Sequence, residues 1–309
     1  MKLIQADATR LPFADQSFDL VFGSPPYADA RTYGIGAQRN AVDWVEFMLR
    51  VTEEACRVSK GLVLWVAAGV TRKWNYWPCC EGLMWEWFKR GNQQWRPAFW
   101  HRVGIPGSGG KQWLRADIEY VLCFTSCKAA VPWADNTANG HAPKWAPGGD
   151  MSYRVADGAR INEWGRYEAS DSGSRKKDGT GRNGVKKTTR RCTRGRSGGD
   201  TIQETAYLPP VLANPGVLIK GIKVGGGLMG HPAAHENEAP FPEKLASWFI
   251  RSWCPPGGVV LDPFSGSGTT VAAATKLGRN GVGADLRLSQ CQLARRRCKD
   301  LQMDILAEA

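Results

Sequence analysis

The sequence predicts an α/β fold in which helices cover both faces of a doubly wound, mostly parallel sheet. Short apolar runs alternate with helical patterns in the first 125 residues and again after residue 230, which is typical of successive β-α-β units. The run Gly61–Ala68 is apolar throughout, as expected of a strand buried on both faces of a parallel sheet. Polar residues directly follow several of the runs, and such sheets bind ligands at the carboxyl ends of their strands.

In the first segment, strands are expected at 2–6, 17–23, 61–68, 96–103 and 118–125. A helix is expected at 43–58, where Trp44, Met48 and Val51 recur at helical spacing, and another at 81–89. The strand at 17–23 runs into Ser24-Pro25-Pro26-Tyr27. Because two successive prolines continue neither a strand nor a helix, this tetrapeptide is expected to stand exposed at the strand's end.

The last segment repeats the alternation. Its expected elements are a helix at 242–253, a strand at 259–261, an alanine-rich helix ending at 277–278, a strand at 280–284 and a basic helix at 288–301. Four polar residues follow expected strands of the two segments: Asp7, Ser24, Asp262 and Asp285. Since the carboxyl ends of parallel strands share one edge of a sheet, we expect these side chains to converge there.

Between these segments, from Lys128 to about Gly230, the pattern dissolves into Gly, Pro, Ser, Thr and charged residues. An insertion or a second small domain is expected here, partly disordered until it binds something. The chain is therefore divided into 1–127, 128–230 and 231–309, with the first and last parts forming one domain.

The charge distribution indicates a polyanionic partner. The net charge is +12, and residues 171–200 hold ten basic and three acidic residues, so this stretch alone carries seven of the twelve positive charges. Lysine and arginine release condensed counterions when they bind phosphates. The alternative is a basic loop that only keeps the protein soluble.

Composition excludes several classes. With 42% hydrophobic and 23% charged residues, the chain is not wholly disordered. The longest apolar run, Gly61–Val70, is half the length of the roughly 20 residues that span a membrane. The N-terminus has no signal-peptide pattern, so a cytoplasmic location is expected. The nine cysteines include no C-x-x-C pair, which favours reduced thiols and no metal site.

Two motifs carry chemistry. Phe264-Ser-Gly-Ser-Gly follows a strand and opens a helix, where glycines admit a ligand close to the backbone and the helix N-terminus favours an anion. With Asp285 at the end of the next strand, it favours a nucleoside-containing cofactor, although a tight structural turn remains the alternative. Ser24-Pro25-Pro26-Tyr27 presents a hydroxyl, a carbonyl and an aromatic face, which suit an amino group on a flat ring. The alternative is a rigid loop with a packed tyrosine.

These motifs resemble those of the S-adenosylmethionine-dependent DNA amino-methyltransferases, in the permuted order called the beta class. The similar stretches are ADATRLPFADQSFDLVFGSPPY, LDPFSGSGTT, GVGADL and APFPEKLASWFI. The resemblance covers about 1–125 and 225–300, and it implies a seven-stranded Rossmann-like methyltransferase sheet with an inserted, partly irregular target-recognition region at 128–230. Two departures are Asp285, where many members have Glu, and His235, which lies too far from Phe241-Pro242 for a role to be assigned.

The resemblance implies S-adenosyl-L-methionine as cofactor, with Asp7 at its adenine, Asp285 at its ribose and the glycine loop at its methionine part. The implied cofactor-binding residues are Asp7, Ala8, Pro242, Glu243, Lys244, Asp262, Phe264, Ser265, Gly266, Ser267, Gly268, Thr269, Thr270, Asp285 and Leu286. The implied catalytic residues are Ser24, Pro25, Pro26 and Tyr27. Ser24 and the Pro25 carbonyl would accept the N–H groups of a flipped base, and Tyr27 would stack on it.

The target base is left open by the sequence. Family members with Ser at the first motif position mostly methylate cytosine N4, so this base is favoured over adenine N6. Residues expected to contact DNA are Arg102, Lys111, Arg115, Arg175, Lys176, Lys177, Lys186, Lys187, Arg190 and Arg191. Most tryptophans are expected in the core, with Trp85 and Phe88 at helical spacing and Trp100 in a strand.

The expected partner is double-stranded DNA, with a homodimer and a cognate restriction enzyme as further possibilities, in a bacterial or phage setting. The rival functions are RNA or protein-glutamine methylation and a DNA-binding protein without catalysis. A nicotinamide dehydrogenase is disfavoured by the missing third glycine of its motif.

Overall fold

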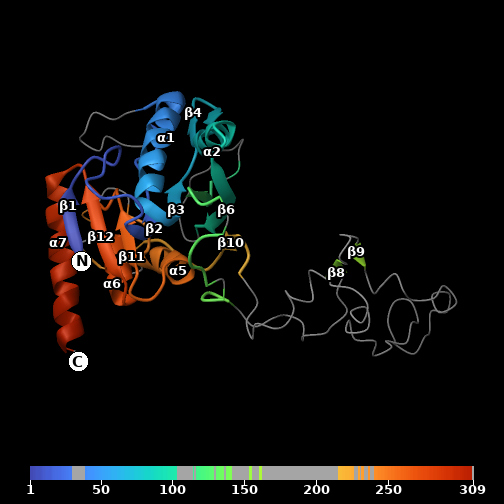
Figure 1. The fold of residues 1–309 in the computed structure, drawn as a ribbon. Coiled ribbons are helices and arrows are strands. Elements are labelled where there is room, and N and C mark those ends of the chain that lie inside the picture. Colours follow the sequence, from blue (N-terminus) through green and yellow to red (C-terminus); the bar gives the residue numbers. More distant parts are fainter. Residues whose placement is uncertain are drawn as a thin grey trace, which may run out of the picture. The chain divides into compact units, whose positions relative to one another are not determined.

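A mixed eight-stranded sheet forms the core of the chain in the computed structural model (Figure 1). The strands lie in the order β1-β12-β11-β2-β3-β7-β6-β10. Their bounds are Lys2–Gln5 (β1), Phe18–Gly23 (β2), Ser59–Ala67 (β3), Gln93–His101 (β6), Ile118–Thr125 (β7), Leu218–Ile219 (β10), Val259–Asp262 (β11) and Asn280–Asp285 (β12). β1, β12, β11, β2 and β3 are parallel, β7 is antiparallel to both β3 and β6, and β10 is parallel to β6.

The structure describes residues 1–29, 39–102, 114, 116–128, 130–135, 137–140, 153–154, 160–161, 215–225, 229, 231–232, 236 and 240–307. The chain divides into two units, one made of 1–139 with 215–309 and the other of 140–214. In the second unit the structure describes Gly140 and an antiparallel pair of short strands, β8 (Tyr153–Arg154) and β9 (Arg160–Ile161). Its role as a target-recognition region, with limits at 128 and 230, stays a prediction.

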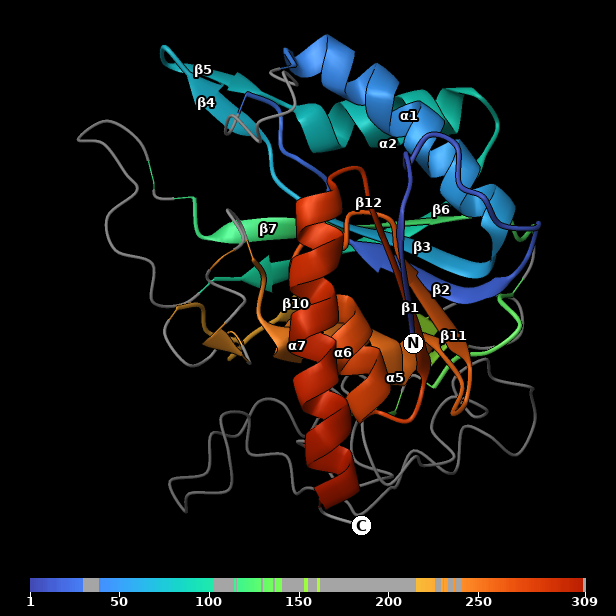
Figure 2. The same ribbon diagram turned by 90° about the vertical axis from the view of Figure 1, so that its left-hand side faces the viewer.

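Helices cover both faces of the sheet (Figure 2). They are α1 (Ala41–Val58), α2 (Cys79–Lys89), α5 (Glu243–Trp253), α6 (Thr269–Lys276) and α7 (Leu288–Ala307). Alternate residues of β3 serve the two faces, since Val63 and Trp65 pack with α1 and α2, whereas Leu62 and Leu64 pack with α5 and α6. No helix in the described part of the chain is both long and apolar enough to span a bilayer.

The expected α/β class and its two-sided helical cover are confirmed, but the expected number of seven strands is wrong. The eighth strand, β10, is only two residues long and pairs with Phe99 and Trp100 of β6. A run this short, within a Gly- and Pro-rich stretch that the sequence pattern assigns to the insertion, carries no periodicity that could reveal it. Nor does any sequence pattern indicate the hairpin formed by β4 (Val70–Arg72) and β5 (Asn75–Trp77).

Two aromatic residues that were expected in the core are exposed. Trp85 and Phe88 of α2 are each 58% exposed, and their rings pack together at 5.9 Å between centroids. Leu83 and Trp87 are buried instead, so the apolar residues of this helix are spread around its surface and only one set faces the sheet. Trp100, expected in a strand, is buried as predicted.

The connections reverse direction between β2 and β11. After β2 the chain crosses by α1 to β3, and after β11 it crosses by α6 to β12 in the opposite direction. α1 and α6 pack on opposite faces of the sheet. The adjacent carboxyl ends of β2 and β11 are therefore the topological switch point, where open α/β sheets bind their ligands.

Candidate active site

The two chemical motifs, far apart in sequence, adjoin at this switch point. Leu20 and Val21 of β2 pair with Val260 and Leu261 of β11, so Ser24 and Asp262 leave the same edge side by side. The approach is close: a Cβ added to Gly23 would lie 2.6 Å from Asp262 Oδ1. The proline tetrapeptide and the glycine loop thus lie beside each other at one edge of the sheet, as the sequence predicted.

The Ser24–Tyr27 tetrapeptide is held by its neighbours in the fold. The Ser24 hydroxyl donates to the Val66 carbonyl of β3 at 3.0 Å. The indole nitrogen of the buried Trp44, in α1, donates to the Pro26 carbonyl at 2.7 Å. Because the Ser24 proton is committed to Val66, the lone pairs of its oxygen are available to accept hydrogen bonds.

Tyr27 is fixed by a carboxylate that the sequence did not single out. Its hydroxyl donates to Glu119 Oε2 of β7 at 3.0 Å, and Arg102 pairs with Oε1 of the same buried carboxylate. Burial raises the pKa of Glu119, and Arg102 and Tyr27 oppose that shift. Burial, followed by the charge of Glu119, also raises the pKa of Tyr27. Tyr27 is therefore a neutral donor whose ring is locked in place.

The glycine loop is built for close backbone approach. Gly266 and Gly268 have φ values of 49° and 80°, which residues with a Cβ rarely adopt. The Gly268 N–H donates to the Ser265 carbonyl at 2.7 Å, and the Ser265 N–H donates to the Ala284 carbonyl at 2.9 Å. In the described structure, Ser265 Oγ is buried without a hydrogen-bond partner.

Two aspartates at the ends of β11 and β12 hold this loop by hydrogen bonds. Asp262 Oδ1 accepts the Phe264 N–H at 3.0 Å, and its Oδ2 accepts the Thr270 hydroxyl at 2.6 Å. Burial raises the pKa of Asp262 to about 7. Asp285 accepts the N–H groups of Gly266 at 3.0 Å and of Arg287 at 2.9 Å. Both carboxylates, expected at the cofactor, thus also shape the loop.

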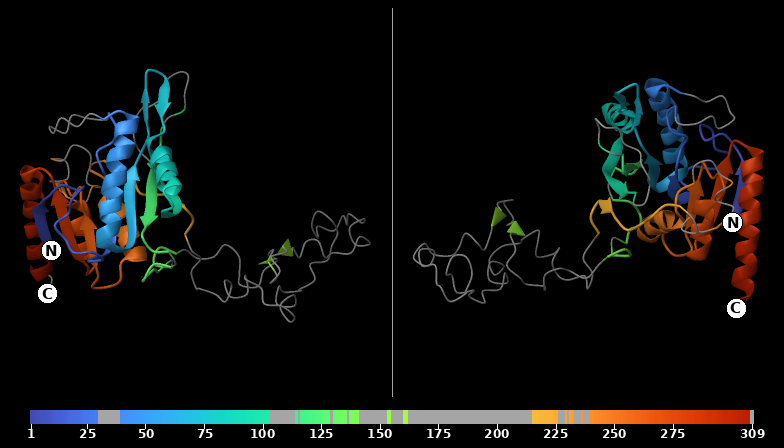
Figure 3. Two further views of the ribbon diagram at one scale, coloured as in Figure 1. Left: turned by 45° about the horizontal axis from the view of Figure 1, so that its top comes forward. Right: turned by 180° about the vertical axis from the view of Figure 1, so that it is seen from behind.

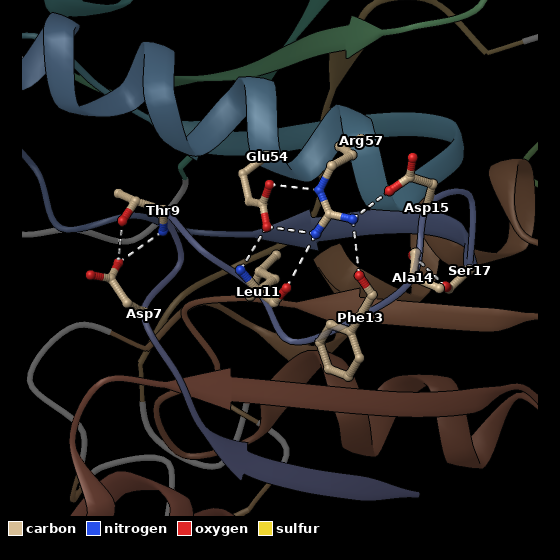
Figure 4. Close-up of polar contacts among 9 residues, drawn as sticks. All are labelled: Asp7, Thr9, Leu11, Phe13, Ala14, Asp15, Ser17, Glu54 and Arg57. Atoms are coloured by element: carbon tan, nitrogen blue, oxygen red, sulfur yellow. Dashed lines mark hydrogen bonds and ion pairs between the residues drawn. The ribbon is translucent and has the colours of Figure 1, made fainter.

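The segment after β1 presents Asp7 at the same edge. Asp7 Oδ1 accepts the N–H and the hydroxyl of Thr9, both at 2.8 Å, while Ala8 is buried. Figure 4 shows how α1 fixes the chain that follows: Arg57 donates to the Phe13 carbonyl at 3.0 Å, and Glu54 accepts the Leu11 N–H at 2.7 Å. The Asp7 turn is therefore held between the sheet and α1.

The start of α5 is tied to the glycine loop through buried charges. Glu243 pairs with Arg297 of α7 at 3.0 Å and with Lys276 of α6 at 2.7 Å. Arg297 is fully buried and donates to the Thr269 hydroxyl at 2.9 Å. Glu243 was expected at the cofactor; the structure shows that its carboxylate has two cationic partners, and its cofactor role stays a prediction. The sequence alone does not show that Arg297 is buried while its neighbour Arg296 is exposed.

The remaining expected residues are placed unevenly. Phe264 packs against Trp65, with ring centroids 5.8 Å apart, and Leu286 is half exposed beside Asp285. Arg102 pairs with Glu119, which in turn accepts the hydrogen bond of Tyr27, so Arg102 lies near the tetrapeptide. The other residues expected to contact DNA lie outside the described residues; they are Lys111, Arg115, Arg175, Lys176, Lys177, Lys186, Lys187, Arg190 and Arg191.

Comparison with known proteins identifies relatives over most of the chain. The family model described as DNA methylase matches residues 18–296. The orphan methyltransferase M.BamHII of Bacillus amyloliquefaciens is 25% identical over 289 residues, which cover 93% of this chain and 90% of that protein. The type II methyltransferase M.MjaI of Methanocaldococcus jannaschii is 41% identical over 64 residues, 21% of each chain.

Solved structures share the fold. The cytosine-N4-specific PvuII DNA methyltransferase is 16% identical with a TM-score of 0.58, covering 95% of this chain and 84% of its own. The putative DNA modification methylase TTHA0409 of Thermus thermophilus, solved with S-adenosyl-L-methionine, is 22% identical with a TM-score of 0.53, covering 96% and 92%. At these identities the likeness shows a common architecture.

Proposed function

The chain belongs to the DNA methylase family, and we propose that it transfers the methyl group of S-adenosyl-L-methionine to an exocyclic amino group of a base in double-stranded DNA. The observation that carries this proposal is the junction of the two motifs. A donor held by the glycine loop and an acceptor held by Ser24–Tyr27 would lie at the adjacent ends of β11 and β2. Methyl transfer needs this proximity, since the transition state joins both substrates.

The site fits the cofactor. The buried, unpartnered hydroxyl of Ser265 and the left-handed glycines offer hydrogen-bonding capacity and a close backbone approach beside the N-terminus of α6, which favours a carboxylate. Phe264–Thr270 and Pro242–Lys244 would hold the methionine part, Asp285 and Leu286 the ribose, and Asp7 and Ala8 the adenine. When bound, the cofactor supplies an electrophilic methyl group on a positively charged sulfur.

The chain's own residues orient the acceptor. The amino nitrogen of a base is a weak nucleophile because its lone pair is delocalised into the ring. Ser24 Oγ and the Pro25 carbonyl would accept its two N–H bonds, which turns the lone pair towards the methyl carbon. In a duplex the amino group is paired and stacked, so the base must first leave the helix, with Tyr27 as the surface on which it stacks.

Cytosine N4 is the favoured acceptor, because Ser24 stands at the first motif position. The alternative is adenine N6, with low sequence specificity if the basic segment binds phosphates without reading base edges. A different class of function is a DNA-binding protein that holds the cofactor without turnover. A homodimer, a cognate restriction enzyme and a cytoplasmic setting stay predictions.

Mass spectrometry of nucleosides tests the proposal. Plasmid DNA is incubated with the protein and methyl-labelled cofactor and then digested. Labelled N4-methylcytosine supports the favoured reading, and labelled N6-methyladenine supports the alternative base. Cofactor binding without label in any nucleoside would contradict methyl transfer and support the silent DNA-binding protein.

Variants of the tetrapeptide test the assigned roles. Ser24→Ala and Tyr27→Ala are expected to reduce turnover far more than cofactor affinity, since neither side chain is assigned to the cofactor. Equal losses in turnover and cofactor affinity would contradict those assignments.

A further inference from the structure

The β4–β5 hairpin stands at the same edge of the sheet as the active site (Figure 3). β3 runs parallel to β2 and ends at Ala67, and the hairpin begins three residues later. Its two strands pair from Val70 with Trp77 to Arg72 with Asn75. The two residues at the tip, Lys73 and Trp74, therefore extend outward from the carboxyl end of the strand next to the tetrapeptide.

The tip has an unfavourable backbone and an exposed ring. Lys73 and Trp74 have φ values of 45° and 68°, the left-handed region that two-residue hairpin turns require and that Asn and Gly usually supply. Trp74 is 68% exposed and Lys73 is exposed as well. Residues that favour the turn would remove this strain, so the use of a cation and a large aromatic ring points to a function for the side chains.

The hairpin is joined, next to its tip, to the segment that follows the tetrapeptide. Arg72 Nε pairs with Asp29 Oδ2 at 2.5 Å, and the same guanidinium donates to the Asp29 carbonyl. Asp29 is the second residue after Tyr27. On the other strand, the Tyr76 hydroxyl donates to Glu81 of α2 at 3.0 Å. Each strand thus has a contact to a neighbouring segment, and the Arg72–Asp29 pair places the tip near the tetrapeptide.

We propose that this tip is a DNA-contacting element, in which Trp74 stacks on the DNA beside the flipped nucleotide and Lys73 meets a phosphate. The inference rests on the proposed function. A nucleotide that leaves the duplex exposes the faces of its neighbours, and a rigid aromatic ring at the active-site edge can cover them. The cation beside the ring suits the phosphate backbone, which makes nucleic acid the occupant that the chemistry favours.

The test compares Trp74→Ala and Trp74→Phe with Trp85→Ala, which removes another exposed tryptophan from α2. The first substrate is a short duplex that carries the site methylated in plasmid DNA, mapped by sequencing. The second is the same duplex with an abasic sugar opposite the target base, which lowers the cost of flipping. Methyl transfer and cofactor binding are measured for each protein.

Trp74→Ala is expected to lower kcat/KM on the paired duplex about tenfold or more, with Trp74→Phe in between and Trp85→Ala unchanged. Cofactor affinity should not change, and the abasic duplex should recover most of the loss. Normal activity of Trp74→Ala, or an equal loss on both duplexes, would overturn the inference. A shift of Trp74→Ala to a smaller assembly on gel filtration would also overturn it, by placing the tip at a subunit interface. If the wild-type protein methylates no DNA, the proposed function itself fails.

Discussion

Replacing Asp262 with asparagine should remove a pH dependence of stability while keeping the loop intact. The carboxyl is 1% exposed, and burial raises its pKa from 3.8 to about 7, with Thr270 and Phe264 opposing the shift. Between about pH 4 and pH 7 the folded protein therefore keeps a proton that the unfolded chain has released. Relative to high pH, the bound proton therefore stabilises the folded protein. This stabilisation is fully present below the pKa of the unfolded state and is lost as pH rises through the pKa of the folded state.

The expected magnitude follows from the two pKa values. A pH unit is worth about 1.36 kcal/mol while the folded acid is fully protonated, and less as that acid titrates near pH 7. From about pH 5 to about pH 7, Asp262 should therefore cost the wild type about 2.3 kcal/mol of stability. An asparagine resembles the protonated acid. Its oxygen can accept the Phe264 N–H, and its amide can donate to Thr270, whose own proton is then free for the Phe22 carbonyl 3.4 Å away.

Urea unfolding across this pH range measures the effect. The difference in stability between Asp262→Asn and the wild type should grow in favour of the variant by about 2.3 kcal/mol from about pH 5 to about pH 7. Thr270→Ser keeps the donor and serves as the control, with a pH profile like that of the wild type. A variant whose stability falls with pH as steeply as the wild type would refute the reasoning.

Three further substitutions test how the site is held. Glu119→Ala removes the buried partner of Tyr27 and Arg102 and should lower the free energy of unfolding in urea by roughly 3–5 kcal/mol. Glu119→Gln keeps a hydrogen-bond acceptor and should lower it less, so equal losses would contradict the pairing. Arg297→Ala should lower the free energy of unfolding by a similar amount, because the Glu243 carboxylate loses a buried partner. Adding Glu243→Gln should restore part of that stability, and no recovery would show that the unpaired charge of Glu243 is not the cause. Gly23→Ala brings a methyl group within 2.6 Å of Asp262 Oδ1. It should impair methyl transfer with little change in circular dichroism, whereas full activity would show that the glycine loop can move to accommodate the methyl group.

Much of the architecture follows from local patterns in the sequence. The expected strand at 118–125 matches β7, and the expected helices match α1, α2, α5 and α6 to within a few residues, because apolar periodicity and proline or glycine boundaries are local signals. The convergence of Ser24 and Asp262 was also predictable, since parallel strands place their carboxyl ends together. The exposed Trp85 was not, because hydrophobicity alone does not say which side of a helix is covered.

The residues that hold the site come from distant parts of the chain, and this explains why motif reasoning missed them. Glu119 meets Tyr27 across 92 positions, and Trp44 meets the Pro26 carbonyl across 18. Glutamate in a strand and arginine in a basic helix are ordinary surface residues by type, so only the fold shows that Glu119 and Arg297 are buried. A buried charge without a partner destabilises the fold, so each such residue needs a hydrogen-bonding or charged partner elsewhere in the chain. The motifs therefore indicate where the proposed chemistry would take place, while these long-range polar pairs hold the side chains of the candidate site in position.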